Sequence, residues 1–166
     1  TEEHVSLFQQ YPPRDIEVSV YGVSPETYQR VTRKPGSYRA FRRGLDLLAQ
    51  SGVKVRLKAM ALRSNLDEFP QIAHFCRQYT KDFFRFDPML HMRYDGNENR
   101  NQEIRSERLS PDEIVALEQA DVERADLLQR DCDKLIMPEL TAREDNSLFH
   151  CGAGKSTFTV GYDGSF

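Results

Sequence analysis

Residues 53–62 read Val-Lys-Val-Arg-Leu-Lys-Ala-Met-Ala-Leu, and from Val53 to Ala59 every second side chain is apolar. Residues 16–22, Ile-Glu-Val-Ser-Val-Tyr-Gly, alternate in the same way and end at a glycine. A period of two is typical of a β-strand that buries one face. Both stretches are therefore predicted to be strands, and residues 82–89, which are rich in Phe, are predicted to be a third.

Helix signals lie between the first two predicted strands. Ser24-Pro25-Glu26 combines an N-cap residue, a proline at the first helical position and an acid in the first turn. Lys34-Pro35-Gly36 interrupts this helix, and Ser37 is expected to cap a second one. Gly52 follows it, as glycine does at helix C-termini.

Asn65 and Glu68 have the spacing of a capping pair for a third helix, over residues 66–79. The predicted order is therefore strand, helix, strand, helix, strand. Alternation of this kind implies βαβ units, right-handed crossovers and a parallel sheet. The sequence predicts an α/β fold.

The second half of the chain gives weaker signals. The polar residues 94–108 are predicted to form a loop, and Ser110-Pro111-Asp112-Glu113 starts a helix that should run to about Arg130. Residues 131–148 are expected to be irregular, and residues 156–160 to form a short strand. Asp163-Gly164 favours a tight hairpin turn.

Composition excludes several classes of protein. The 166 residues have a net charge of −3, with 39% hydrophobic and 30% charged residues, which excludes an acidic disordered tail, a collagen and a disulfide-rich mini-protein. No apolar run is long enough to span a membrane. The three cysteines, Cys76, Cys132 and Cys151, are too few for a disulfide framework, so we expect a reducing, cytoplasmic setting.

Charge is divided unevenly along the chain. Residues 1–60 hold 10 basic and 6 acidic side chains, whereas residues 61–166 hold 13 basic and 20 acidic ones. This balance argues against tight, unspecific binding of nucleic acid by the whole chain. The basic part is still suited to an anionic ligand.

The second face of each predicted strand is polar, which is unusual for a sheet covered by helices on both faces. One interpretation is a solvated face on which Glu17, Arg56 and Arg85 form salt bridges. The other is that the sheet curls into a barrel whose polar face is the lumen. Ligands in such barrels bind at the carboxyl ends of the strands. The candidate site residues are then Ser19, Tyr21, Lys58, Met60 and Asp87.

Several segments, taken in order, resemble the radical S-adenosylmethionine enzymes. The matching stretches resemble the fourth, fifth and sixth barrel strands, the segment that opens the helix after the fourth strand, and the start of the auxiliary SPASM region. They are DIEVSVYG at 15–22, YQRVTRKPGSY at 28–38, VKVRLKAMALRSNLDE at 53–68, residues 82–92, and Cys151-Gly152-Ala153-Gly154 followed by Gly164.

The resemblance implies the C-terminal part of a partial (β/α) barrel, with parallel strands and helices on one face, followed by a helix and a truncated hairpin. Residues 1–109 would form the partial barrel and residues 110–148 a linking helix and loop. Residues 149–166 would begin the SPASM-like region. The C-x-x-x-C-x-x-C motif that holds the family's catalytic cluster is not present in this sequence.

Site roles follow from the same resemblance. Ser19 matches a serine that contacts S-adenosylmethionine, and Arg33 lies beside the position, Thr32, where the family often has an arginine that binds the ligand's carboxylate. Cys151 matches the first ligand of an auxiliary iron–sulfur cluster. The whole enzyme would use a [4Fe–4S] cluster and S-adenosylmethionine to abstract hydrogen from a peptide, a protein or a small-molecule cofactor precursor.

The chain on its own is expected to be an inactive fragment that holds neither cofactor. An unpaired strand edge recruits other chains, so self-association is also expected. Binding partners among nucleic acids and membranes are not expected. Two other functions stay open: an ordinary (β/α) barrel enzyme that binds an anionic metabolite near Lys58, and a non-enzymatic α/β module whose charged face docks a partner.

Overall fold

The computed structural model describes residues 1–80, 83–135, 159–161 and 163–165. The chain has two compact units, Thr1–Asp131 and Cys132–Phe166, and each is described by itself. The division into domains at residues 109 and 148 stays a prediction.

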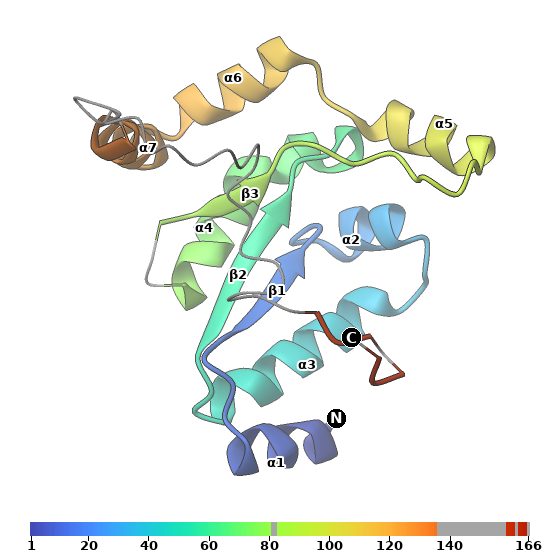
Figure 1. Cartoon of the computed structure of the whole chain (residues 1–166), viewed down its shortest axis with the longest axis vertical. Coiled ribbons are helices and arrows are strands. Elements are labelled where there is room, and N and C mark those ends of the chain that lie inside the picture. Colours follow the sequence, from blue (N-terminus) through green and yellow to red (C-terminus); the bar gives the residue numbers. More distant parts are fainter. Residues whose placement is uncertain (81–82, 136–158, 162, 166) are drawn as a thin grey trace, which may run out of the picture. The chain divides into compact units, whose positions relative to one another are not determined.

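The first unit contains a parallel sheet of three strands (Figure 1). The strands are β1 (Ile16–Val20), β2 (Val55–Met60) and β3 (Arg85–Asp87), and they lie side by side in chain order. This confirms the predicted parallel α/β arrangement. The strands are shorter than predicted, most of all β3.

The connections between the strands are helical. From β1 the chain runs through α2 (Pro25–Thr32) and α3 (Ser37–Gln50) to β2, and then through the 3-10 helix η1 (Arg63–Glu68) and α4 (Phe69–Tyr79) to β3. Ser24 caps α2 as predicted, since its hydroxyl accepts a hydrogen bond from the Thr27 amide at 3.2 Å. Ser37 does not cap α3: it is the first helical residue, and Gly36 is the N-cap.

The core lies between the apolar face of the sheet and the helices α3 and α4, which lie behind the sheet in Figure 1. The register places Val18 beside Leu57 and Val20 beside Ala59, so alternate side chains from adjacent strands meet on one face. Burying this face is the main stabilising contribution to the fold. The core side chains from strands and helices include Val20, Leu45, Leu57, Ala59, Ile72, Cys76, Phe84 and Phe86.

The predicted loop at 94–108 is wrong, because the structure has a helix there, α5 (Glu98–Glu107). The Asn97 side chain caps it by accepting a bond from the Arg100 amide at 3.1 Å. Asn101 is buried and its side chain accepts a bond from the Arg93 amide at 2.8 Å. These tertiary and capping contacts form a helix from a sequence with no apolar face.

The single helix predicted from 110 to 130 is also corrected, because the chain forms two, α6 (Pro111–Ala120) and α7 (Val122–Leu135). They are separated by Asp121, whose backbone is extended. Its carboxylate accepts a bond from the Arg124 amide at 3.1 Å and pairs with Arg77 of α4 at 2.7 Å. This carboxylate thus caps α7 and links it to α4. Because α7 continues to Leu135, the irregular segment does not begin at 131.

Arg124 joins α7 to the residue that precedes β3. It is 7% exposed, donates to the carbonyl of Phe84 at 2.8 Å, pairs with Glu118 and lies 4.3 Å from the ring centre of Phe86. The guanidinium thus has polar partners despite its burial, as a buried charge requires.

Two further elements complete the described part. An N-terminal helix, α1, spans Glu2–Gln10. At the other end, Gly164 donates its amide to the Gly161 carbonyl at 3.0 Å, and Gly161 donates to the Ser165 carbonyl at 2.6 Å. The two-residue hairpin turn predicted at Asp163-Gly164 stays a prediction. Thr159 and Val160 are not in a strand, and the rest of the predicted strand, together with Cys151, lies outside the described residues.

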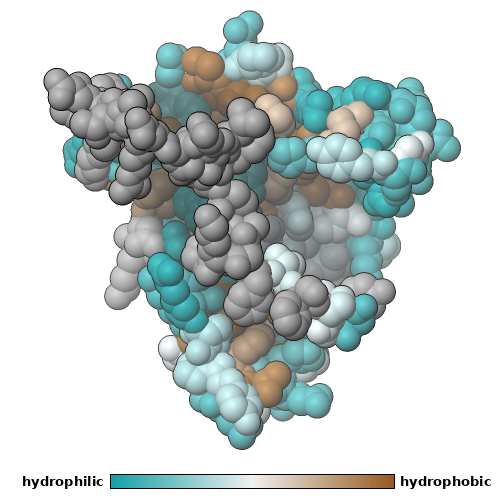
Figure 2. All heavy atoms as spheres, viewed as in Figure 1, coloured by the Kyte–Doolittle hydropathy of each residue, from teal (hydrophilic) through white to brown (hydrophobic). Residues whose placement is uncertain are grey.

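The surface in Figure 2 is largely hydrophilic, with hydrophobic residues gathered over α6. None of the helices in the described part of the chain has both the length and the apolar character needed to cross a membrane.

Gly22, directly after β1, is a glycine for steric reasons. A Cβ at this position would lie 2.8 Å from the backbone nitrogen of Tyr28, whereas a Cβ at Gly44 in α3 would meet nothing within 4 Å. We expect Gly22→Ala to lower the free energy of unfolding by about 1–3 kcal/mol through overpacking. Gly44→Ala, the matched control, should raise it by about 0.5–1 kcal/mol. Urea denaturation measures both, and equal effects of the two substitutions would contradict this packing.

Candidate functional site

The polar face of the sheet carries charged side chains from all three strands. The register places Glu17 beside Arg56, Ser19 beside Lys58, and Lys58 beside Arg85. This arrangement confirms the predicted facing of these residues, since the helices α3 and α4 pack on the opposite face.

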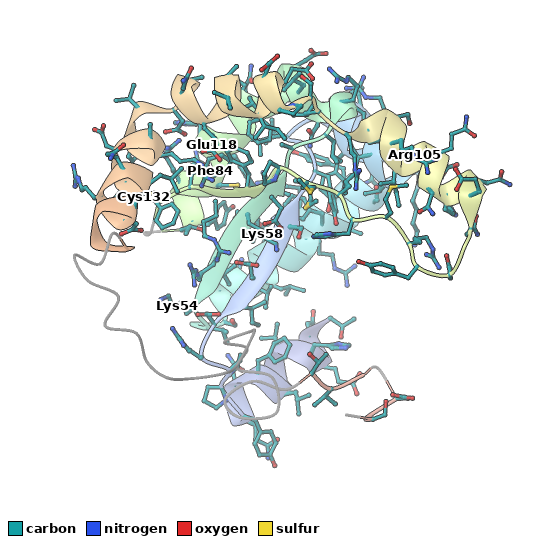
Figure 3. The ribbon with its side chains drawn as sticks, turned by 45° about the horizontal axis from the view of Figure 1, so that its top comes forward. Lys54, Lys58, Phe84, Arg105, Glu118 and Cys132 are labelled. Atoms are coloured by element: carbon teal, nitrogen blue, oxygen red, sulfur yellow. The ribbon has the colours of Figure 1, made fainter. Side chains whose placement is uncertain are left out.

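The charges on this face are arranged as alternating ion pairs. Lys58, in the central strand, lies 3.1 Å from the Glu17 carboxylate and 2.9 Å from that of Asp87, so it links β1 to β3 (Figure 3). Arg85 pairs with the other oxygen of Glu17 at 3.0 Å. Arg56 lies 3.7 Å from Asp15. Arg56, Lys58 and Arg85 thus each have a carboxylate partner on this face.

Lys58 is held as an ammonium ion by its two neighbours. Hydrogen bonds to Asp87 and Glu17 raise the pKa of Lys58 above its ordinary value, despite the opposing effect of partial burial. A lysine in this state is not a nucleophile, because nucleophilic lysines need a lowered pKa. Nor is its charge free to bind an anion without displacing one of these carboxylates.

The loop after β1 is joined to the segment after β2 by Asn65 of η1. Asn65 is fully buried, and its side chain donates to the carbonyls of Tyr21 at 3.0 Å and Met60 at 2.9 Å. Its oxygen accepts the amide of Leu62 at 2.9 Å. One amide group therefore satisfies three backbone groups at the carboxyl ends of two strands.

Glu68 adds a second link to the same loop. Its carboxylate accepts the amides of Val23 at 2.9 Å and Ser24 at 3.2 Å, and also the hydroxyl of Ser24. Partial burial would raise the pKa of Glu68, but the hydrogen bonds from Ser24 and Val23 outweigh it and hold that pKa below its usual value.

The prediction that Asn65 and Glu68 cap a helix over 66–79 is therefore wrong. The helix α4 begins at Phe69, and neither side chain makes its cap. Asn65 caps the preceding 3-10 helix η1 by accepting the Leu62 amide, and both side chains also bond a loop more than 40 residues earlier in the chain. Their spacing was the signal available in the sequence, but it does not distinguish a local cap from a long-range contact.

A hollow of about 500 Å³ lies at the carboxyl ends of the strands, which is where parallel α/β sheets bind ligands. We call it the carboxyl-edge hollow. All three post-strand segments contribute to it, together with the end of α2 and one side of α5. Its lining includes Tyr21, Arg33, Leu62, Ser64, Leu90 and Glu107.

Charges of both signs line the carboxyl-edge hollow. Arg33 and Arg100 each lie 2.8 Å from a different oxygen of Glu103. Hydrogen bonds from these two arginines hold the pKa of Glu103 below its ordinary value. Ser64 donates its amide and hydroxyl to Glu107 at 3.0 and 2.6 Å. The sequence singled out Arg33 but not Arg100 or the two glutamates, which come from the helix that was predicted to be a loop.

The structure brings the predicted site residues together only in part. Tyr21 and Arg33 line the carboxyl-edge hollow, whereas Met60 and Asp87 line a neighbouring hollow of about 370 Å³ that shares Leu90 with it. Ser19 and Lys58 lie on the polar face of the sheet. Cys151 lies outside the described residues.

The described residues do not suit a metal centre. Among residues 1–80, 83–135 and the described part of the C-terminus, no group of three or more His, Cys, Asp or Glu side chains could hold a metal ion. Burial raises the pKa of Cys76 to about 12, which disfavours the thiolate form that binds iron. Cys132, in the second unit, is exposed.

Comparisons with protein-family models, with curated proteins and with solved structures find no match to this chain.

Asn65 offers a test of the link between the two loops. Asn65→Ala leaves three buried backbone groups without their partner, so we expect the free energy of unfolding to fall by about 2–3 kcal/mol. Asn97→Ala, which removes only the exposed cap of α5, should cost about 1 kcal/mol. Urea denaturation compares the two variants, and an equal or smaller loss for Asn65→Ala would contradict the assigned role.

Glu68 offers a test by pH. Because its pKa is lower in the folded protein than in the unfolded chain, its contribution to stability is present above the unfolded pKa and is lost as pH falls through the folded one. Between about pH 6 and pH 3, the wild type should therefore lose more free energy of unfolding than Glu68→Gln. The control, Glu26→Gln, changes an exposed acid of α2 and should follow the wild type. Parallel curves for wild type and Glu68→Gln would refute this role.

Proposed function

We propose that this chain forms the later strands of the barrel of a radical S-adenosylmethionine enzyme, which modifies a peptide, a protein or a cofactor precursor by hydrogen abstraction. One observation carries the proposal. The segments 15–22 and 53–68, two of those that resemble the family, are joined by Asn65 and Glu68 at the carboxyl edge of the sheet. The strands are parallel and sequential, and among the described residues of the first unit the helices of the core, α3 and α4, pack on the opposite, apolar face. Both features support a partial barrel.

S-adenosylmethionine has chemistry that suits this edge. Its methionyl group carries an ammonium and a carboxylate, and the carboxyl-edge hollow presents arginines and glutamates to bind them. Arginine binds carboxylates through paired hydrogen bonds. Arg33 donates one hydrogen bond to Glu103 at 2.8 Å, and the ligand's carboxylate would take the place of Glu103 there. Ser19, on the lumen side of β1 under the proposed barrel, would offer its hydroxyl to a ribose or carboxylate oxygen.

The described residues do not supply the ligands of a [4Fe–4S] cluster, and we derive no step that passes through one. In the proposed enzyme the catalytic cluster belongs to residues outside this sequence, which lacks the C-x-x-x-C-x-x-C motif. Cys151 is proposed as one ligand of an auxiliary cluster, and one thiolate alone does not hold a cluster. The part of this chain in the reaction is to position the ligand and to shape the barrel lumen.

The ion pairs of the polar face favour this proposal over the two other functions. An anionic metabolite at Lys58 would have to displace the Glu17 or Asp87 carboxylate. A partner docked on this face would meet charges that already neutralise each other. A barrel lumen, by contrast, needs such mutual pairing, because unpaired charges away from bulk water are costly.

The test uses the gene product that contains this chain, isolated without oxygen and supplied with a reductant. We expect it to cleave S-adenosylmethionine to 5′-deoxyadenosine and methionine, measured by chromatography. Ser19→Ala removes one hydrogen bond to the ligand and should raise KM by about fivefold. Ser6→Ala, which alters an exposed hydroxyl on α1, serves as the matched control and should leave KM unchanged.

Two outcomes would contradict the proposal: no cleavage by the reduced gene product, or the same KM for Ser19→Ala and wild type. A calorimetric titration of the isolated chain with S-adenosylmethionine should show weak binding or none, since most of the contacts of the proposed site come from other parts of the enzyme. A dissociation constant in the micromolar range would show that this chain is more than a fragment of the site.

A further inference from the structure

The helices α2 and α3 and the connection between them form the most basic part of the chain. Residues 27–45 contain six Lys or Arg and no Asp or Glu. The whole chain has a net charge of −3, so subtracting these six positive charges leaves −9 for all other residues. A local excess of this kind creates a positive potential on an otherwise acidic protein, and it attracts anionic partners.

Three of the six cations have structural partners. Arg30 donates to a backbone carbonyl of η1 at 2.7 Å, Arg33 pairs with Glu103 at 2.8 Å, and Arg42 lies 5.1 Å from the ring centre of Phe75. These contacts explain why arginines occupy those positions. They do not explain the other three cations.

Lys34, Arg39 and Arg43, which we call the basic surface, are exposed. Within the part of the chain that the structure describes, they form no ion pair. Arg39 and Arg43 are four residues apart on α3, so their side chains lie on the same face of the helix, one turn apart. Lys34 lies in the connection just before that helix begins. No stabilising contact within the described structure accounts for these three cations.

The connection that carries Lys34 is held rigidly. Gly36 has a φ of 78°, and its amide donates to the side chain of Gln29. The hydroxyls of Thr32 and Ser37 lie 2.7 Å apart, which joins the end of α2 to the start of α3. A surface that is already ordered loses little conformational entropy on binding.

We propose that the basic surface binds an acidic segment of a peptide or protein.

A nucleic acid fits this surface less well, because single strands bind through exposed aromatic side chains as well as cations. The aromatic residues of this region are engaged elsewhere: Phe41 stacks on Tyr28 at 4.8 Å, and the Tyr38 hydroxyl donates to the Val23 carbonyl at 2.8 Å. The net charge of −9 on the other residues also repels an extended polyanion more than a short acidic segment. This binding goes beyond the proposed function and does not require the radical chemistry.

The experiment measures binding of a fluorescein-labelled peptide of alternating Glu and Ser residues to the full chain, by fluorescence anisotropy at low salt. The triple variant Lys34→Glu, Arg39→Glu, Arg43→Glu should lose at least about tenfold in affinity, since each of several weak surface pairs turns repulsive. The control variant Arg14→Glu, Lys54→Glu, Arg130→Glu has the same net charge and alters exposed cations elsewhere. It should lose less than about threefold. Circular dichroism checks that each variant is folded.

The charge-neutral variant Lys34→Gln, Arg39→Gln, Arg43→Gln provides the same comparison if the charge reversal does not fold, and it should lose affinity in the same direction. The proposal is overturned if the wild type does not bind the peptide, or if the variant and control lose affinity equally. It is also overturned if neither loses affinity, or if a single-stranded oligonucleotide of the same charge binds more tightly than the peptide. Because no cofactor or turnover enters the assay, these outcomes are independent of the proposed enzyme activity.

Discussion

The carboxyl edge of the sheet depends on the buried amide of Asn65. Parallel strands end in loops whose backbone groups have no ladder partner, and buried backbone groups need one. Asn65 provides it for the carbonyls of Tyr21 and Met60 and the amide of Leu62, and Glu68 does the same for the amides of Val23 and Ser24. The loop after β1 is thereby held against the segment after β2. Both segments line the carboxyl-edge hollow, so these contacts help to fix its shape.

The two faces of the sheet differ in the interactions that they make. On the face toward α3 and α4, stability comes from removing apolar side chains from water. On the other face, Lys58 lies between two carboxylates, and Arg56 and Arg85 each have an acidic neighbour. Exposed pairs of this kind contribute little to stability in water. Their arrangement matters more for what the face can bind, because a locally neutral surface neither repels a zwitterionic ligand nor attracts a simple anion.

The charged residues elsewhere in the first unit have different structural roles. Arg77, Arg124 and their carboxylate partners hold α6 and α7 to α4 and β3. Arg33 and Arg100 converge on Glu103 beside the carboxyl-edge hollow. The basic surface, on α3 and the connection before it, has no ion-pair partner in the described part of the chain. The arginines in ion pairs hold helices and strands together, whereas the basic surface is suited to contact with another molecule.

Local patterns in the sequence were sufficient to predict the parallel sheet and which side chains share a face. A period of two indicates burial on one side of a strand, and the Ser24-Pro25 start of α2 depends only on neighbouring residues.

The same local patterns gave wrong predictions where a structure depends on contacts between residues that are distant in sequence. Nothing near residues 94–108 shows an apolar stripe, so the helix α5, with its buried Asn101, was missed. Asn65 and Glu68 have the spacing of a cap, yet they bond a loop on another strand. The sequence by itself determined the elements whose causes lie within a few residues. The sequence also predicted salt bridges among Glu17, Arg56 and Arg85, but only the tertiary structure decided the partners, since Arg56 pairs with Asp15 and Lys58 joins Glu17 to Asp87. The carboxyl-edge hollow was likewise decided by the tertiary structure, because it forms between groups that folding alone brings together.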